Sequence, residues 1–240
     1  MSLLKLNHTF GLLTIATCSL TTAATVIEPS QSVMTSSFFQ GNNQVRGYAG
    51  DNRPVFRVSS DNPFGTSGAE TIYLDFTSFV PGNLTEPVTN AVLSVTSISG
   101  GFSADASVTS PFLVSAHGVN ANPFSSITED TNLNGTTDWL SFYSNNIHAA
   151  TSSTSIDSFG VVNFDVTNLV NDWVSEDNNE FFIALTGTND TSGGEFLHGF
   201  SNNTEVAGAT FLTINPVPEP SSTLLVICGL TVGLTRRKRH

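Results

Sequence analysis

Short alternations of apolar and polar residues, separated by turn residues, run through most of the chain between positions 25 and 217. Tyr73 and Asp75, for example, alternate with Ile72, Leu74 and Phe76. A period of two places successive side chains on opposite faces of a β-strand. The pattern therefore predicts an all-β fold in which each strand turns one face toward a core.

The same pattern predicts about nine strands, which lie near residues 54–58, 72–76, 91–95, 107–114, 139–143, 162–166, 181–185, 195–200 and 212–214. Strands of this length with varied connections pack as two antiparallel sheets, so we expect a β-sandwich or jelly roll. The chain shows no internal repeat, and a single domain accommodates all of the strands.

One segment, 165–174, has the period of a helix instead. Leu169, Val170 and Trp173 lie at i, i+1 and i+4 and share one helical face. Asp165 or Thr167 can cap its start. We expect Trp173 to close one end of the sandwich; stacking on a sugar is the alternative role for this side chain.

The C-terminal end has three parts in a fixed order. A turn comes first, then an apolar run at 223–235, then a basic cluster; the turn is Val217, Pro218, Glu219, Pro220 and Ser221, and the cluster is Arg236, Arg237, Lys238 and Arg239. As a helix the run is about 20 Å long, shorter than the ~30 Å hydrocarbon core. The basic residues favour a cytoplasmic end.

This tripartite tail resembles the PEP-CTERM sorting signal of Gram-negative bacteria. The resemblance implies export, recognition by an exosortase-type membrane protease, transient insertion into the inner membrane, and delivery to the cell surface or extracellular matrix. An ordinary C-terminal membrane anchor is the alternative interpretation.

The N-terminal end predicts a secretory signal peptide. Lys5 precedes an apolar stretch at 10–20, and small residues follow at 22–24. We therefore divide the chain into a signal peptide (1–24), a β-sandwich domain (25–215) and a sorting segment (216–240). Cys18 and Cys228 both lie in the terminal segments, so the domain has no disulfide and depends on its hydrophobic core.

The domain is strongly acidic. Its three arginines stand against nineteen of the twenty acidic residues, which gives the stretch 25–217 a net charge of −16. Such a surface repels nucleic acid and anionic lipid headgroups, so we expect no nucleic-acid partner.

Few residues are arranged for catalysis or for transition-metal binding. The domain's histidines, His117, His148 and His198, lack the spacing of metal ligands, and no Gly-x-Ser-x-Gly elbow is present. Calcium needs only oxygen ligands, and two acidic turns are candidates for it: Glu129 and Asp130 in one, Glu176 and Asp177 in the other. Solvated turns are the alternative.

Sugar binding requires exposed aromatic side chains beside hydrogen-bonding groups. Trp139 and Tyr143 lie among polar residues and are the candidate sugar-stacking side chains. Most of the eighteen phenylalanines are expected to build the core.

Three blocks in order resemble the DNRLRE family of β-sandwich modules, which includes carbohydrate-binding members. They are residues 72–95, which resemble the family's hairpin; 162–173, which resemble its Asp-Val-Thr block; and 182–214, which resemble its closing strands. Ala209 stands where the family has a proline. The resemblance implies a jelly-roll module without catalysis.

We therefore predict an exported, non-catalytic protein of the cell surface or of a biofilm or exopolysaccharide matrix. A dedicated carbohydrate-binding module for an extracellular polysaccharide is the alternative function. A polysaccharide lyase or hydrolase is a third, and no cofactor other than calcium is indicated.

Overall fold

The computed structural model describes residues 23–36, 44–45, 55–58, 70–78, 86–99, 107–109, 111–126, 139–188, 198–201 and 207–217. All of them belong to one compact unit, Ala23–Val217. Nearly all of the predicted signal peptide and sorting segment, at 1–22 and 218–240, lies outside the described residues. In the part that is described, no helix has the length and apolar character needed to cross a membrane.

The described chain forms twelve strands and three helices: β1 (Thr25–Ile27), β2 (Gln31–Ser36), β3 (Gln44–Val45), β4 (Val55–Val58), β5 (Glu70–Asp75), β6 (Val88–Ser99), β7 (Phe112–Val119), α1 (Pro123–Ser126), α2 (Trp139–Asn146), β8 (Ile147–Ile156), β9 (Gly160–Asp165), α3 (Thr167–Val174), β10 (Phe182–Thr188), β11 (His198–Ser201) and β12 (Thr210–Pro216).

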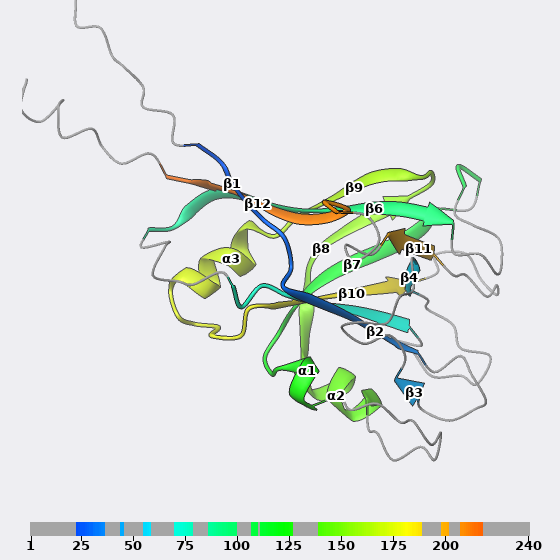
Figure 1. Cartoon of the computed structure of the whole chain (residues 1–240), viewed down its shortest axis with the longest axis horizontal. Helices are drawn as coiled ribbons and strands as arrows, with labels where there is room; N and C mark the ends of the chain where they lie inside the picture. The colour runs from blue at the N-terminus through cyan, green and yellow to red at the C-terminus, as the bar shows by residue number, and fades with distance from the viewer. Residues whose placement is uncertain are drawn as a thin grey trace, which may run out of the picture. The chain divides into compact units, whose positions relative to one another are not determined.

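These strands form two six-stranded antiparallel sheets, which confirms the all-β prediction. Sheet A has the order β1-β12-β6-β11-β4, and β9 pairs with the other edge of β6. Sheet B has the order β3-β2-β5-β10-β7-β8. The two sheets form the two layers of a sandwich-like fold (Figure 1).

The main core lies between the sheets. Leu93, Phe164 and Leu212 face inward from sheet A and are fully buried, and Leu74, Val114 and Ile183 meet them from sheet B. Residues of this kind alternate along β5, β6, β9, β10 and β12, as the period of two predicted.

A second core covers the other face of sheet B. Tyr73 and Phe182 point away from the main core, yet both are buried under α1 and α2. The Tyr73 ring meets Phe142 edge-on with centroids 5.7 Å apart, and the Phe182 ring lies 6.0 Å from that of Phe124. The expectation of one buried face is therefore wrong for β5 and β10, because helices cover their outer side chains.

The predicted strand at 139–143 is wrong, because α2 occupies Trp139–Asn146. Its aromatic residues suggested β-structure, but Trp139, Phe142 and Tyr143 also have the i, i+3, i+4 spacing of one helical face. Asn146 Nδ2 donates to the Phe142 carbonyl at 3.1 Å and so satisfies a group at the helix end. The described chain thus has three helices where the sequence predicted one.

The predicted helix is α3, and it joins the two sheets at one end of the sandwich. The prediction that Asp165 or Thr167 caps the helix is wrong, because Val166 occupies the cap position and makes no side-chain cap hydrogen bond. Asp165 lies one residue earlier, where its Oδ1 accepts the Thr167 N–H at 3.0 Å and the Thr167 hydroxyl at 2.6 Å. These hydrogen bonds, led by that of the Thr167 side chain, lower the pKa of Asp165. The exposed carboxylate therefore stays ionised beside the first turn.

Two polar side chains of α3 hold the edge of β6. Thr167 Oγ1 accepts the Ala91 N–H at 3.0 Å. One turn later, Asn171 Oδ1 accepts the Val88 N–H at 2.7 Å, and its Nδ2 donates to the Val88 carbonyl at 3.3 Å. Because residues i and i+4 share a helical face, α3 supplies partners to the β6 backbone just as a neighbouring strand would.

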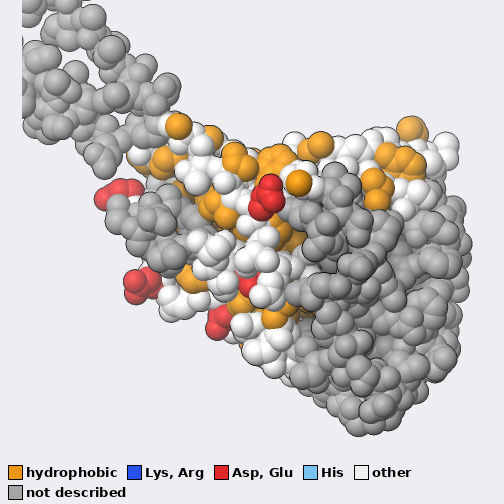
Figure 2. All heavy atoms as spheres, viewed as in Figure 1, with side chains coloured by type: hydrophobic (Ala, Val, Ile, Leu, Met, Phe, Trp, Pro, Cys, Tyr) orange, Lys and Arg blue, Asp and Glu red, His pale blue; other side chains and the backbone are white. Residues whose placement is uncertain are grey.

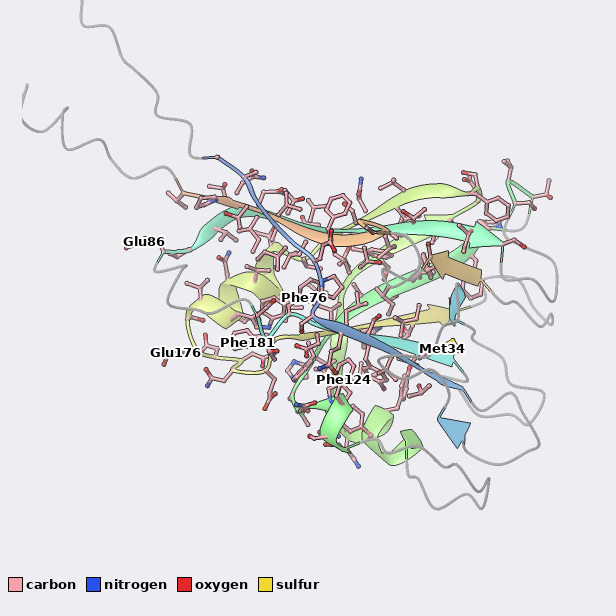
Figure 3. The ribbon with its side chains drawn as sticks, viewed as in Figure 1. Met34, Phe76, Glu86, Phe124, Glu176 and Phe181 are labelled. Atoms are coloured by element: carbon pink, nitrogen blue, oxygen red, sulfur yellow. The ribbon has the colours of Figure 1, made fainter. Side chains whose placement is uncertain are left out.

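The apolar face of α3 enters the main core. Trp173 is fully buried, with its ring centroid 5.7 Å from that of Phe181 and 6.4 Å from that of Phe76. Figure 3 shows Phe76 and Phe181 beside this helix. Leu169 packs on Gly118 of β7 so closely that a Cβ there would lie 2.7 Å from Leu169 Cδ1. Trp173 therefore closes the end of the core, and its burial leaves no ring face for a sugar.

Asn171→Ala should lower the free energy of unfolding by about 2 kcal/mol, because the Val88 N–H and carbonyl both lose their side-chain partner. Asn168→Ala is the matched control, since Asn168 is exposed on the same helix and gains the same helix propensity. Guanidinium unfolding of both variants measures the difference. Equal stabilities would show that the Asn171 side chain does not hold β6.

Candidate functional site

The two residues predicted to stack on sugars lie on the helical cover of sheet B. Trp139 begins α2, and its side chain is outside the described part of the chain. Tyr143 is half-buried and packs against the second core. Burial raises the pKa of Tyr143. Tyr143 therefore lacks the exposed ring that sugar stacking requires.

A row of hydroxyl side chains crosses the same outer face of sheet B. Thr35 of β2 pairs with Thr71 of β5, and Ser115 of β7 pairs with Thr186 of β10 on one side and with Ser153 of β8 on the other. Ser115 Oγ and Ser153 Oγ are 2.7 Å apart, and Thr35 Oγ1 donates to the Thr71 carbonyl at 3.4 Å. Of the five, all but Ser153 are buried, so most of this polar row is closed to a large ligand.

His117 lies two residues after Ser115 on β7, on the same outer face of sheet B. Its Nδ1 lies 2.9 Å from the His148 carbonyl, which can only accept, so Nδ1 carries the proton; Nε2 lies 2.8 Å from Thr186 Oγ1 and accepts from that hydroxyl. Burial lowers the pKa of His117, and the hydrogen bond to the His148 backbone opposes this shift in part. The neutral ring thus ties β7 to β8 and β10.

Two buried hydroxyl oxygens on this face have no hydrogen-bond partner among the described residues. They are Thr71 Oγ1 and Tyr73 Oη, which lie two residues apart on β5. Burial, and secondarily the neighbouring Tyr143, raises the pKa of Tyr73 far above its usual range. The Tyr73 phenol is therefore neutral at any physiological pH.

Of the two predicted calcium turns, the structure describes one, and calcium binding stays a prediction. Glu176 and Asp177 are exposed in the turn after α3, where Glu176 has a left-handed backbone with φ of 62° (Figure 3). The Asp177 carboxylate accepts the Ser175 hydroxyl at 2.8 Å. Glu129 and Asp130 lie outside the described residues. Within the described part of the chain, no three histidine, cysteine or acidic side chains come together as a metal site.

The outer face of sheet A is open to solvent, and we call it the A face. It carries the outward side chains of β1, β12, β6 and β9, where rows such as Val26-Thr213-Val92-Asp165 and Phe211-Ser94-Asn163 run across the strands. Val26 is 62% exposed and Val161 63%. Figure 2 shows orange hydrophobic side chains among white ones along the upper margin, where Figure 1 draws these strands.

Exposed apolar side chains concentrate on or beside the A face. The described residues include five exposed large hydrophobic side chains; four of them, Val26, Phe159, Val161 and Val217, lie on this face or at its ends, and the fifth is Val108. The polar groups between them pair with one another: Ser94 Oγ donates to Asn163 Oδ1 at 2.8 Å, and Asn215 Nδ2 donates to Asn90 Oδ1 at 3.3 Å. Asp165 is the one charged side chain in the rows given above.

A cleft of about 360 Å³ adjoins the A face at the β8–β9 hairpin. Its lining is the continuous stretch Thr154–Asn163. Phe159, at the hairpin turn, is 55% exposed. The alternating pattern did not identify Phe159 as a binding residue. Its neighbours Ser158 and Gly160 are turn residues, so the sequence could have indicated an aromatic side chain in a turn, away from the core.

The domain's two chain ends lie together at the end of sheet A opposite this cleft. Thr25 of β1 pairs with Ile214 of β12, and Val217 follows β12 directly. Pro216 pairs with Val88 on β6, whereas Gly160 pairs with Ser97. The nine residue steps between those β6 positions span about 30 Å. The described chain therefore begins and ends at the end of sheet A that is far from the β8–β9 hairpin.

The chain matches no protein-family model, and no curated protein matches it in sequence. The likeness to PEP-CTERM and DNRLRE proteins therefore stays a prediction from the quoted motifs.

Tyr73→Phe should leave the fold intact and raise the free energy of unfolding by about 1 kcal/mol, because it removes a buried hydroxyl that lacks a partner. The ring, with its edge-on contact to Phe142, is retained. Thermal unfolding measures the change, with the half-buried Tyr143→Phe as control. A clear loss of stability in Tyr73→Phe would show that the hydroxyl is hydrogen-bonded in solution.

In the His117→Gln variant, the free energy of unfolding should fall less between pH 8 and pH 5 than it does in the wild type. Because the folded-state pKa of His117 lies below its ordinary value of 6.5, the unfolded chain binds the proton more readily. Neutral His117 therefore contributes fully to the free energy of unfolding above about pH 6.5, and this contribution is lost as the pH falls below that value. Melting temperatures between pH 8 and 5 test this, with the exposed His148→Gln as control. Parallel profiles for wild type and His117→Gln would contradict it.

Proposed function

We propose that this is an exported, non-catalytic protein of the cell surface or extracellular matrix, whose A face contacts extracellular polysaccharide. The supporting observation is the concentration of exposed apolar side chains on one open, nearly uncharged sheet face. Exposed apolar patches mark interaction surfaces, and the interspersed amides and hydroxyls can exchange hydrogen bonds with a hydroxyl-rich polymer.

The balance of charge favours this class of partner over the other polymers of the envelope. A net charge of −16 over 25–217 repels nucleic acid and anionic headgroups. A polysaccharide without charge experiences no such repulsion. Many weak contacts along a repeating polymer also add up to strong retention, which suits a sheet face that extends over several strands.

The strand order supports a jelly roll as the finer description of the domain. Eight strands, β1, β5, β6, β7, β8, β9, β10 and β12, can be counted from 1 to 8 along the chain. In sheet A they then stand in the order 1-8-3-6, and in sheet B in the order 2-7-4-5. This is the strand order of two Greek keys folded into a jelly roll. It is the fold that the DNRLRE resemblance implies.

Export rests on the two terminal motifs, residues 1–24 and 216–240, through the secretory route and an exosortase-type protease. The position of the chain ends agrees with this route. Because Thr25 and Val217 leave the domain at one end of sheet A, a protein held by its tail presents the rest of the A face outward.

A dedicated carbohydrate-binding module is the second candidate function, and the cleft beside Phe159 favours it. The two functions share the A face and differ in selectivity. A matrix protein holds many related polymers weakly, whereas a binding module selects one sugar unit.

The test is the amount of the full chain retained in the matrix fraction of a Gram-negative host that carries an exosortase. Val161→Asp should reduce this amount about tenfold, because a carboxylate on the A face must be desolvated on contact. Val108→Asp makes the same change on an exposed valine in the turn between β6 and β7, and should have no effect. The chain without residues 1–24 should stay in the cell. Equal retention of Val161→Asp and wild type would refute the role of the A face.

A further inference from the structure

The cleft at the β8–β9 hairpin forms because its two strands enter different sheets. β8 pairs with β7 in sheet B, and β9 pairs with β6 in sheet A. Past the turn at 157–159 the strands move apart, and the Thr154 hydroxyl, donating to the Asn163 carbonyl at 3.0 Å, bridges them. The space of about 360 Å³ that they enclose is in the size range of small-molecule sites.

The lining combines an apolar surface with hydrogen-bonding groups. Phe159 and Val161 are more than half exposed, although a folded chain usually covers such side chains. Asp157 accepts the Ser158 hydroxyl at 2.9 Å through Oδ1, and its Oδ2 has no hydrogen-bond partner among the described residues. Asn163 uses Oδ1 to accept from Ser94, so its Nδ2 is free to donate to a ligand.

The chemistry of this lining matches an uncharged sugar. A pyranose has an apolar C–H face, which packs on an aromatic ring, and a rim of hydroxyls, which need both donors and acceptors. Phe159 supplies the ring, Asp157 the acceptor and Asn163 the donor. Asp157 is the one ionic group of the lining, so a uronate, sulfate or phosphate group would meet an unbalanced negative charge.

We propose that the β8–β9 cleft binds one uncharged pyranose unit of a neutral polysaccharide, with the adjoining units lying along the A face. Val161 and Asn163 line the cleft and also belong to the A face, so the two surfaces are continuous. Beyond them lie the half-buried Thr96 and Phe211, which a polymer leaving the cleft would contact next. This inference rests on the proposed function, in which the A face contacts extracellular polysaccharide, and it names the sugar class and the residues that contact it.

Isothermal titration of the full chain tests the proposal with neutral hexasaccharides of glucose, mannose and galactose, and with a uronate hexasaccharide of the same length. At least one neutral probe should bind, and the uronate should not. Phe159→Ser should weaken that binding at least tenfold, and Phe159→Tyr should restore it, because the ring face is kept. Val108→Ser is the control for the loss of an exposed apolar side chain that does not line the cleft.

Phe159 is exposed, so its replacement should leave the melting temperature unchanged, and this is measured in parallel. Binding that is equal in Phe159→Ser and wild type, preference for the uronate, or binding to none of the neutral probes would overturn the cleft proposal. If the full chain still enters the matrix and Val161→Asp still reduces its retention, the proposed function stands without the cleft. If matrix retention is also absent, the proposed function itself is refuted.

Discussion

The structure depends on the junction that α3 makes between the two sheets. Thr167 and Asn171 supply hydrogen-bond partners to Ala91 and Val88 at the start of β6, while Trp173 closes the core behind them. No disulfide can join the sheets, because neither cysteine lies in the domain. The strand pairs are also distant in sequence: β1 pairs with β12, and β5 with β10. Closing such long loops costs entropy. The segment from β9 through α3 is short in sequence and joins sheet A to the end of the core, so we expect its contacts to form early in folding.

The sequence predicted the fold well wherever one face of a strand meets the core and the other meets solvent. β6, β9 and β12 have this arrangement, and their alternation identified them. β2 was missed because Val33 faces the second core and Met34 the main core, so consecutive residues are buried and the period of two disappears. β8 was missed for the opposite reason: its alanines, serines and threonines carry almost no apolar signal, and Ile156 is its one fully buried residue. In α2, aromatic residues that favour strands in general form a helical face that covers sheet B, since tertiary packing overrides propensity.

The candidate site was harder to predict than the fold. A core residue follows the alternating apolar pattern, whereas an exposed binding residue interrupts it. Tyr143 was selected for its polar neighbours, yet it packs on the second core, since α2 lies over sheet B. Phe159 belongs to no alternating set and was grouped with the core-building phenylalanines. The A face itself could not be recognised from sequence, because its rows join residues such as Val26, Thr213 and Val92, whose proximity arises only from the register of three strands.

The outer faces of the two sheets differ in exposure, and under the proposed function they have different roles. The segment between β7 and β8 contributes α1 and α2, which bury the outer face of sheet B and exclude large ligands from it. Sheet A has no such cover from the described residues and retains exposed valines beside paired amides. Charge also differs between the proposed contact surface and the rest of the domain. The acidic groups keep copies of the protein apart over a range that salt shortens, whereas contact at the nearly uncharged A face depends on apolar packing and hydrogen bonds, which salt screens little. The proposed function is therefore compatible with a net charge of −16 over 25–217, because the repulsion between copies and the proposed contact with a neutral polymer use different surfaces.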